Sequence, residues 1–321
     1  MRPDTNGATR VEASVPSLLD LMHLSRRPIL SPGGVDLLRQ IALLTEMKEG
    51  DEVLVVPAGL AVTLEYFVSE HDVVGSGVEG DPTLFERAGK RLHSLGILER
   101  VHIQLGQMDS LPFKDGIFDV VVAELGFPSR AAPEKSANEL VRVAKPGSNV
   151  VVVQPVWKAP VCSERRAVLS QYLGCRPLTV VEWKRLLREA GLEHLYVQNW
   201  SEEETAFRPQ IRKPFPDFTE LFSLTEKFGI LRRARHRWGW AGVWTVLARE
   251  RQIHKILTKE RILGLDLVKG MKKDDQAVVR VAKSKSTLSV GKSEDLGHSP
   301  EDDNAGEGQV TGLPLFDDGR P

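Results

Sequence analysis

Three acidic residues stand where short apolar segments of the chain end. Glu79 closes the segment DVVGSGVE, Asp109 follows VHIQLGQM, and Glu124 follows FDVVVA. An ionised carboxylate only accepts hydrogen bonds, and it can accept one from each hydroxyl of a ribose diol. It can equally accept from an exocyclic amine such as that of adenine. The three acids are therefore the first candidates for a ligand site.

The acid at position 79 has a structural alternative, because an acidic residue at this point often caps the next helix. Asp81 and Pro82 already provide such a helix start, with an N-cap residue followed by proline at the first helical position. Glu79 is therefore available for another role, and we predict that it binds a ribose.

The remaining two acids each have more than one open role. Asp109 can accept a hydrogen bond from an adenine amine, with Met108 over the face of the ring, or it can form an Asx turn before Pro112. Glu124 can bind substrate, act as a base, or face solvent. For Asp109, the matching position of Glu79 in the preceding unit favours ligand binding, whereas the roles of Glu124 stay open.

The elements that position these acids are valine-rich strands. Strands are predicted in VLVV, in HDVVGSGVE, in VHIQLG, in FDVVVAELG and in SNVVVVQPV, with helical segments PTLFERAGKRLHSLG and SANELVRVA between them. Strands that alternate with helices at this spacing indicate a parallel sheet wrapped by helices. Ligands of such sheets bind beyond the carboxyl ends of the strands, so the acids should share one edge.

The rest of the chain has weaker patterns. Two short amphipathic helices are predicted before residue 47, and EWKRLLREAGLEHLYV predicts a helix, a stop at Gly191 and a strand. The segment 218–239 is predicted to be largely helical, and 241–250 is a candidate for the last strand. The final segment from Lys269 is charged and poor in large apolar residues, which is typical of a disordered tail.

Composition excludes several classes of protein. The chain has 321 residues with a formal net charge of -1, so no global field draws it to nucleic acid or to an anionic membrane. Its two cysteines, Cys162 and Cys175, support no disulfide framework and match no zinc motif. We find no secretory signal and no apolar run of the ~18 residues that a membrane span needs. A soluble, cytoplasmic protein is expected.

Several ordered motifs resemble those of the class I S-adenosylmethionine-dependent methyltransferases. These motifs are EGDP followed by LFERAGKR, then GQMDSLPFKDGIFDVVVAELGF, then NELVRVAKPGSNVVVVQP, and the late segment EWKRLLREAGLEHLYV. LSPGGVDLLRQIALLTEMKEGDEVL resembles the first segment of the small-molecule branch, which includes ubiquinone/menaquinone-type and arsenite-type enzymes. The resemblance covers about residues 48–200, with a weaker similarity to residue 250.

The resemblance implies a Rossmann-like α/β fold. Its sheet would have seven strands, mostly parallel with an antiparallel last strand, and helices on both faces. It implies S-adenosylmethionine as cofactor, direct methyl transfer to a small molecule, and no metal. Glu79 would hold the ribose and Asp109 the adenine amine. The implied cofactor contacts are Pro57, Ala58, Gly59, Glu79, Gly80, Met108, Asp109, Glu124 and Leu125, with Glu124 also the candidate catalytic residue.

The first cofactor loop departs from the family pattern. Val55 stands at the position of the family's acid, Pro57 and Ala61 at two glycine positions, and only Gly59 is retained. Proline removes an N–H, and the added side chains place bulk in the loop. A catalytically inactive protein that uses this fold for binding or as a scaffold is therefore the alternative function.

A few single features allow more than one interpretation. The arginines and tryptophans of LRRARHRWGW can grip a nucleic acid strand, but a solvated helix face followed by aromatics packed on the sheet is the favoured interpretation. The two cysteines are interpreted as buried free thiols, not metalloid ligands. His23 lies on the first predicted helix, which by family analogy could close over the site, but a partly buried helix residue is the favoured interpretation. No pattern indicates an oligomeric state.

The predicted organisation has five parts. A disordered N-terminus spans 1–14, and N-terminal helices that cap the site span 15–47. The methyltransferase-like domain spans 48–250, a helix or linker spans 251–268, and a disordered tail spans 269–321.

Overall fold

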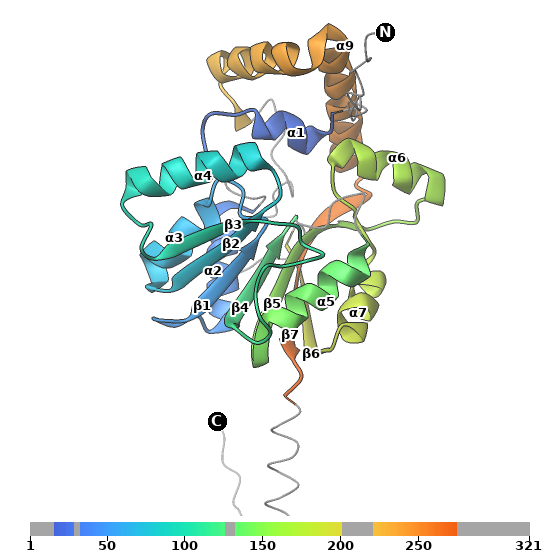
Figure 1. Ribbon diagram of the computed structural model, residues 1–321. Helices are drawn as coiled ribbons and strands as arrows, with labels where there is room; N and C mark the ends of the chain where they lie inside the picture. Colours follow the sequence, from blue (N-terminus) through green and yellow to red (C-terminus); the bar gives the residue numbers. More distant parts are fainter. Residues whose placement is uncertain (1–15, 29–32, 126–131, 201–220, 275–321) are drawn as a thin grey trace, which may run out of the picture. The chain divides into compact units, whose positions relative to one another are not determined.

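The computed structural model describes residues 16–28, 33–125, 132–200 and 221–274. They contain a seven-stranded sheet of order β3-β2-β1-β4-β5-β7-β6 (Figure 1). The strands are β1 (Glu52–Val56), β2 (Val74–Glu79), β3 (Val101–Leu105), β4 (Phe118–Glu124), β5 (Ala144–Trp157), β6 (Leu192–Asn199) and β7 (Leu263–Lys272). Five strands run parallel, and β7 pairs antiparallel with both β5 and β6. The predicted α/β sheet with an antiparallel last strand is confirmed.

Helices cover both faces of the sheet, as the alternation in β1 requires. Val53 and Val55 belong to one core cluster, while Leu54 and Val56 belong to the other, because successive strand residues point to opposite faces. The first cluster is closed by α2 (Gly34–Thr45), α3 (Val62–His71) and α4 (Pro82–Leu95). The second is closed by α5 (Pro133–Val143) and α7 (Val180–Glu189). Both faces of β1 are therefore buried, which accounts for its unbroken apolar run.

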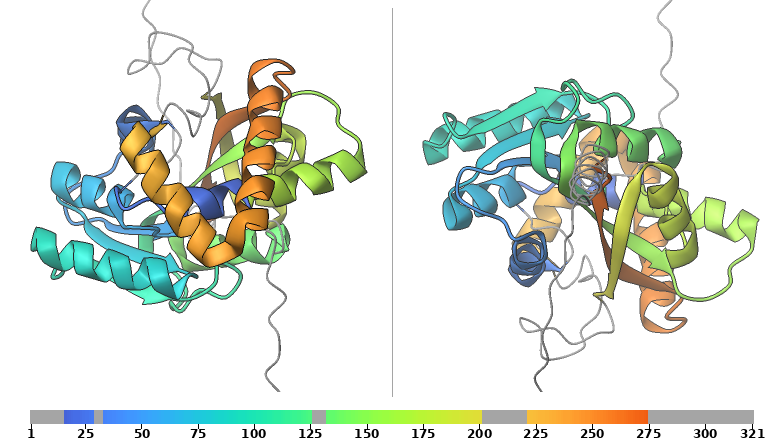
Figure 2. Two further views of the ribbon diagram at one scale, coloured as in Figure 1. Left: turned by 90° about the horizontal axis from the view of Figure 1, so that it is seen from above. Right: turned by 90° about the horizontal axis from the view of Figure 1, so that it is seen from below.

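Two further helices cover the carboxyl edge of the sheet. Helix α9 (Leu224–Thr258) bends at Gly239, whose φ of 70° is not helical. Seen from above, its two arms enclose α1 (Leu18–His23) (Figure 2). Leu21 of α1 packs with Ile230 and Val243 from the two arms. Helix α6 (Ser163–Leu173) lies beside the second arm in another apolar cluster.

The expectation that both N-terminal helices cap the site is wrong for the second one. Leu37, Leu38 and Ile41 of α2 are fully buried against a face of the sheet. Only α1 lies at the carboxyl edge, where it contacts α9. Both helices are amphipathic, so the pattern revealed their apolar stripe without revealing which surface that stripe covers.

The C-terminal boundaries also differ from the prediction. Residues 241–250 form part of α9, not the last strand, because Val243 and Val246 lie three residues apart on one buried helix face. The last strand is β7, which continues past the predicted start of the tail at Lys269 to Lys272. Lys269 was assigned to a charged tail, but its ammonium donates a hydrogen bond of 2.6 Å to the carbonyl of Leu44 within the fold. The predicted N-terminus 1–14 and residues 275–321 of the predicted tail lie outside the described residues.

No helix in the described part of the chain combines the length and apolar character needed to cross a bilayer.

The end of β7 supplies a test of this correction. A chain that stops after Val268 loses Lys269 to Lys272, which pair with β5 and β6. Several backbone hydrogen bonds of ~1 kcal/mol each are lost, so we expect a melting temperature lower by about 5–10 °C than in a chain that stops after Asp274. Calorimetry of the two truncated chains measures the difference. Equal melting temperatures would contradict the assignment of 269–272 to the sheet.

Candidate functional site

The Glu79 carboxylate joins two turns at the carboxyl edge of the sheet. Its Oε2 accepts a hydrogen bond of 2.8 Å from the N–H of Gly59, in the turn after β1. Its Oε1 accepts one of 2.9 Å from the N–H of Asp81, in the turn after β2. The residue is only 5% exposed. Asp81 in turn caps α4 through its own carboxylate, so the prediction that it starts this helix is confirmed.

Burial raises the pKa of Glu79 above its usual value, and the N–H groups of Asp81, Gly59 and Gly80 oppose the rise. Each carboxylate oxygen has two lone pairs, and each oxygen of Glu79 accepts one strong backbone bond. Acceptor capacity therefore remains on both oxygens, which is what a ribose diol requires.

The loop that departs from the family pattern is closely packed beneath its exposed side. Ala58 N–H donates 2.8 Å to Val78 O, and Ala61 N–H donates 2.8 Å to Ala58 O. The methyl groups of both alanines are buried in the core. A Cβ added at Gly59 would meet nothing within 4 Å. The expected bulk therefore lies largely in the core and not over Gly59.

The same loop begins with a cis peptide bond between Val56 and Pro57. The loop ends at Ala61, which immediately precedes α3. Ala61 has a left-handed φ of 59° and makes no side-chain cap to the helix. Leu60 is partly exposed, and its carbonyl accepts a hydrogen bond of 3.3 Å from Arg91. The loop thus presents backbone groups at the sheet edge, although only one glycine of the family pattern remains.

The turn after β3 lies beside the Glu79 turn. Gly106 N–H donates 3.0 Å to the carbonyl of Glu79, and a Cβ on Gly80 would lie 3.3 Å from the amide of Gln107. Met108 is buried in the core, whereas Asp109 is exposed. The structure thus brings the predicted ribose and adenine residues to adjacent turns.

The Asx-turn alternative for Asp109 is wrong. Such a turn would bond its carboxylate to the N–H of Leu111, but that N–H donates 2.7 Å to Glu139. The carboxylate of Asp109 makes no hydrogen bond to any residue within the described ranges. It is therefore exposed and available to a ligand.

Glu124 does not face solvent, which removes one of its three open roles. It is 5% exposed and accepts a hydrogen bond of 2.9 Å from the hydroxyl of Thr63, in the first turn of α3. The following residue, Leu125, has a left-handed φ of 52° and donates its N–H 2.9 Å to Val153. Thr63 was not predicted, because its partner lies 61 positions away in the chain.

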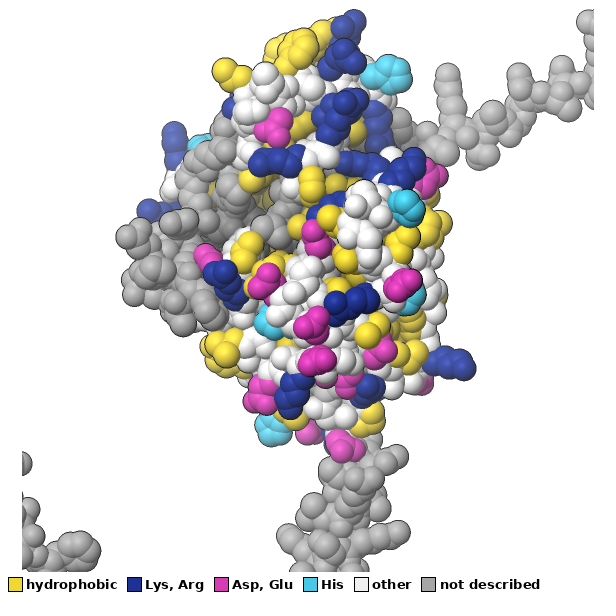
Figure 3. All heavy atoms as spheres, turned by 90° about the vertical axis from the view of Figure 1, so that its left-hand side faces the viewer, with side chains coloured by type: hydrophobic (Ala, Val, Ile, Leu, Met, Phe, Trp, Pro, Cys, Tyr) yellow, Lys and Arg dark blue, Asp and Glu magenta, His cyan; other side chains and the backbone are white. Residues whose placement is uncertain are grey.

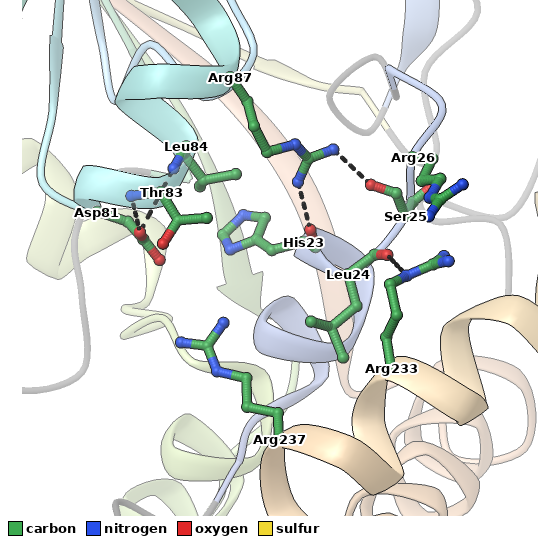
Figure 4. A pocket seen from close by; sticks show the side chains of 10 residues that line it. All are labelled: His23, Leu24, Ser25, Arg26, Asp81, Thr83, Leu84, Arg87, Arg233 and Arg237. Atoms are coloured by element: carbon green, nitrogen blue, oxygen red, sulfur yellow. Dashed lines mark hydrogen bonds between the residues drawn. The ribbon is translucent and has the colours of Figure 1, made fainter.

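A basic pocket beside this edge was also missed. Its volume is about 260 Å³, and it is lined from α1, α4 and α9 by His23, Leu24, Ser25, Arg26, Asp81, Thr83, Leu84, Arg87, Arg233 and Arg237 (Figure 4). Two of its arginines belong to the segment interpreted as a solvated helix face. The separation of four residues between Arg233 and Arg237 was a usable signal, because it places them on the same side of a helix.

The interpretation of the neighbouring aromatics needs a correction too. Trp240 does not pack on the sheet but is 56% exposed, with the Arg235 guanidinium 4.9 Å from its ring centroid. The thiols also differ from one another. Cys175 is buried, which raises its pKa to about 12, whereas Cys162 is exposed and not buried as expected. The residues that the structure describes contain no group of three or more potential metal ligands.

Comparison with known proteins places this site in a family context. Residues 58–152 match the family model described as a methyltransferase domain. The chain is 25% identical over 190 residues to a probable chloroplastic tocopherol O-methyltransferase of Oryza sativa subsp. japonica, covering 55% of this chain and 52% of that protein. It therefore spans about half the length of this curated relative.

Solved structures support the fold. The [4+2]-cyclase SpnF superposes with a TM-score of 0.60 at 20% identity, covering 75% of this chain and 82% of the cyclase. A Haemonchus contortus phosphoethanolamine N-methyltransferase 2, in complex with phosphomonomethylethanolamine and S-adenosylhomocysteine, gives 0.59 at 16% identity, covering 81% and 59%. At these identities the likeness shows the fold alone, and a fold of this kind hosts more than one chemistry.

The contact between the loop after β1 and strand β2 can be tested through Gly77. A Cβ at this position would lie 2.7 Å from the Ala58 methyl and 2.9 Å from Leu64 Cδ1. We expect Gly77→Ala to destabilise the fold by about 1–3 kcal/mol, as overpacking does. Ala58→Gly in the same chain should recover part of the loss, measured by urea unfolding in a double-mutant cycle. Purely additive effects would show that the two residues do not press on each other.

Proposed function

We propose that this chain, whose residues 58–152 match a methyltransferase domain, transfers the methyl group of S-adenosylmethionine to a small-molecule acceptor. One observation carries the proposal. A buried carboxylate at the end of β2 is held by Gly59 and Asp81 so that both of its oxygens can still accept. Burying a carboxylate is costly unless hydrogen-bond donors or an opposite charge replace its lost hydration. The two hydroxyls of a ribose diol would supply such donors.

The residues at the sheet edge are assigned to the cofactor as follows. Glu79 accepts hydrogen bonds from the ribose hydroxyls, with Gly80 beside it. Asp109 accepts from the adenine amine, and Met108 packs near the ring. The loop Pro57-Ala58-Gly59 and the residue Leu125 border the remainder of the cofactor. The fit is supported by the open space at Gly59 and by the exposed carboxylate of Asp109.

Glu124 is the candidate to replace the acid that the first loop lacks. The family's acid is replaced by Val55, which is buried in the core. The neighbouring strand supplies a carboxylate at the same edge, since Val56 pairs with Ala123 and Glu124 follows directly. Thr63 fixes its orientation. We assign Glu124 to the ammonium group of the cofactor or to the acceptor.

The chemistry that S-adenosylmethionine supplies when bound is an electrophilic methyl group on a sulfonium sulfur. The chain's contribution is to align the acceptor nucleophile with that methyl and to keep water out. Helices α1 and α9 cover the edge where this alignment takes place (Figure 2). The reaction is a direct displacement, in which the acceptor forms a bond to the methyl carbon as the sulfur–carbon bond breaks.

The alternative is an inactive protein that retains the fold for binding or as a scaffold. The altered first loop favours it, since Val55 replaces an acid and Pro57 lacks an N–H. The exposed carboxylate of Asp109 opposes it, because it makes no contact within the described ranges that a scaffold would need, beside a Glu79 whose raised pKa reflects incompletely compensated burial. A small-molecule acceptor is in line with the name of the rice relative, a tocopherol O-methyltransferase. A cytoplasmic location remains part of the proposal.

The role of Glu79 is testable with S-adenosylhomocysteine. Glu79→Ala removes hydrogen bonds to a charged acceptor, so we expect binding weaker by about 1–3 kcal/mol, or about 5- to 150-fold. Isothermal titration calorimetry measures the affinity. Glu86→Ala, which removes an exposed carboxylate from α4, serves as the matched control and should bind normally. Unchanged affinity in Glu79→Ala would remove the ribose assignment, and no binding by the unmodified chain would favour the inactive alternative.

The raised pKa of Glu79 predicts a pH dependence of binding. Only the ionised form accepts from both hydroxyls, so affinity should fall as the pH is lowered, and the fall should begin at a higher pH than for an ordinary glutamate. Because the pKa is higher in the folded than in the unfolded chain, protonation of Glu79 as the pH falls does not itself destabilise the fold. Calorimetry on Glu79→Gln should show a flatter profile. An identical slope would mean that another group titrates.

A further inference from the structure

The basic pocket between α1, α4 and α9 carries more positive charge than its own residues neutralise. Four arginines line it, and the single carboxylate among its lining residues belongs to Asp81. That carboxylate is engaged, since it accepts a hydrogen bond of 2.7 Å from the Thr83 N–H and caps α4. Figure 3 shows Lys and Arg side chains gathered over the upper part of the neighbouring face, with Asp and Glu more frequent below.

Two of the four arginines are held in place by backbone carbonyls. Arg87 donates 2.9 Å to His23 O and 2.5 Å to Ser25 O, while Arg233 donates 2.7 Å to Leu24 O. These bonds fix both guanidinium groups against the segment that follows α1. A carbonyl oxygen is neutral, so the positive charge of each arginine is oriented but not compensated.

The remaining two arginines of the pocket are Arg26 and Arg237. Neither forms an ion pair or a hydrogen bond with a residue in the described ranges. In Figure 4 the guanidinium groups of Arg87 and Arg237 lie on opposite sides of the His23 ring. Desolvation lowers the pKa of Arg233, and repulsion from Arg26, Arg87 and Arg232 lowers it further. An anion in the pocket would relieve this repulsion.

We propose that this pocket binds the carboxylate or phosphate group of an anionic methyl acceptor. The planar fork of a guanidinium matches these oxyanions with paired hydrogen bonds. The pocket adjoins the cofactor edge, because Asp81 lines the pocket and also donates its N–H to Glu79. The identification of the anion's owner as a methyl acceptor rests on the proposed function. The same oxyanion chemistry could come from the carboxylate of the cofactor itself, so the test must separate the two sources.

The first arm of the test measures anion binding by the full chain. Inorganic phosphate and acetate are titrated by calorimetry at constant ionic strength. We expect saturable binding of at least one of them, weakened about 10-fold or more in the double variant Arg26→Gln/Arg237→Gln. Neither side chain has a partner in the described structure, so the variant should fold normally. Arg251→Gln, which removes an exposed charge of α9 away from the pocket lining, is the control.

The first arm can also overturn the proposal. Absence of saturable binding by the unmodified chain refutes an oxyanion site. An equal loss in Arg251→Gln and in the double variant refutes it as well, because it would indicate only the general positive field of the helix.

The second arm identifies the source of the anion. The same titration is repeated with the chain saturated by S-adenosylhomocysteine. Phosphate or acetate affinity that stays within about 2-fold supports the acceptor, because the cofactor then occupies a different position. Competition between the two ligands overturns the acceptor assignment and gives the pocket to the cofactor carboxylate.

The two arms keep this inference distinct from the proposed function. If S-adenosylhomocysteine binds but no oxyanion does, the inference fails and the proposed function stands. If an oxyanion binds but S-adenosylhomocysteine does not, the proposed function fails and takes the acceptor assignment with it.

Discussion

The carboxylate of Glu79 is the constraint on which the rest of the site depends. It accepts one backbone N–H from the turn after β1 and one from the turn after β2, so it sets the separation of the two turns that would enclose a cofactor. A buried carboxylate loses much of its hydration, and two backbone donors replace only part of it. The pKa of Glu79 is raised because this compensation is incomplete. Two hydroxyl donors from a ribose would complete it.

The same constraint explains how the first loop tolerates its substitutions. Gly77 lacks a Cβ at the point where Ala58 approaches, and the methyl groups of Ala58 and Ala61 lie in the core. The exchange of glycine for alanine has therefore filled space below the loop. The loop lacks a carboxylate, since Val55 is an apolar residue at the position of the family's acid. Glu124, buried at the tip of the adjacent strand, is a second acid close to this edge, besides Glu79.

The covering helices add a second electrostatic feature that is independent of the sheet. The bend of α9 at Gly239 allows its two arms to enclose α1, and arginines of the first arm then meet the start of α4. The sheet edge offers carboxylates and the cover offers guanidinium groups. This separation of charge fits a site with two different tasks, in which acids hold hydroxyl and amine donors and arginines hold an oxyanion. The fold is shared with a [4+2]-cyclase, so the chemistry of the edge depends on its residues and not on the fold.

Local signals in the sequence determined the parallel sheet, the helix start at Asp81-Pro82 and the positions of Glu79, Asp109 and Glu124 at strand ends. These features follow from periodicity and from residues adjacent in the chain, so no distant contact was needed to find them. Only the tertiary structure decided that residues 241–250 are helical and that β7 extends through Lys272. The pairing partners of β7 lie far away in the chain, and its lysines bond to carbonyls that no local pattern reveals. The pocket arginines were decided in the same way, because Arg26, Arg87 and Arg237 come from three separate segments of the chain. Their charges interact only after the chain has folded, and a sequence records each charge but not the space between them.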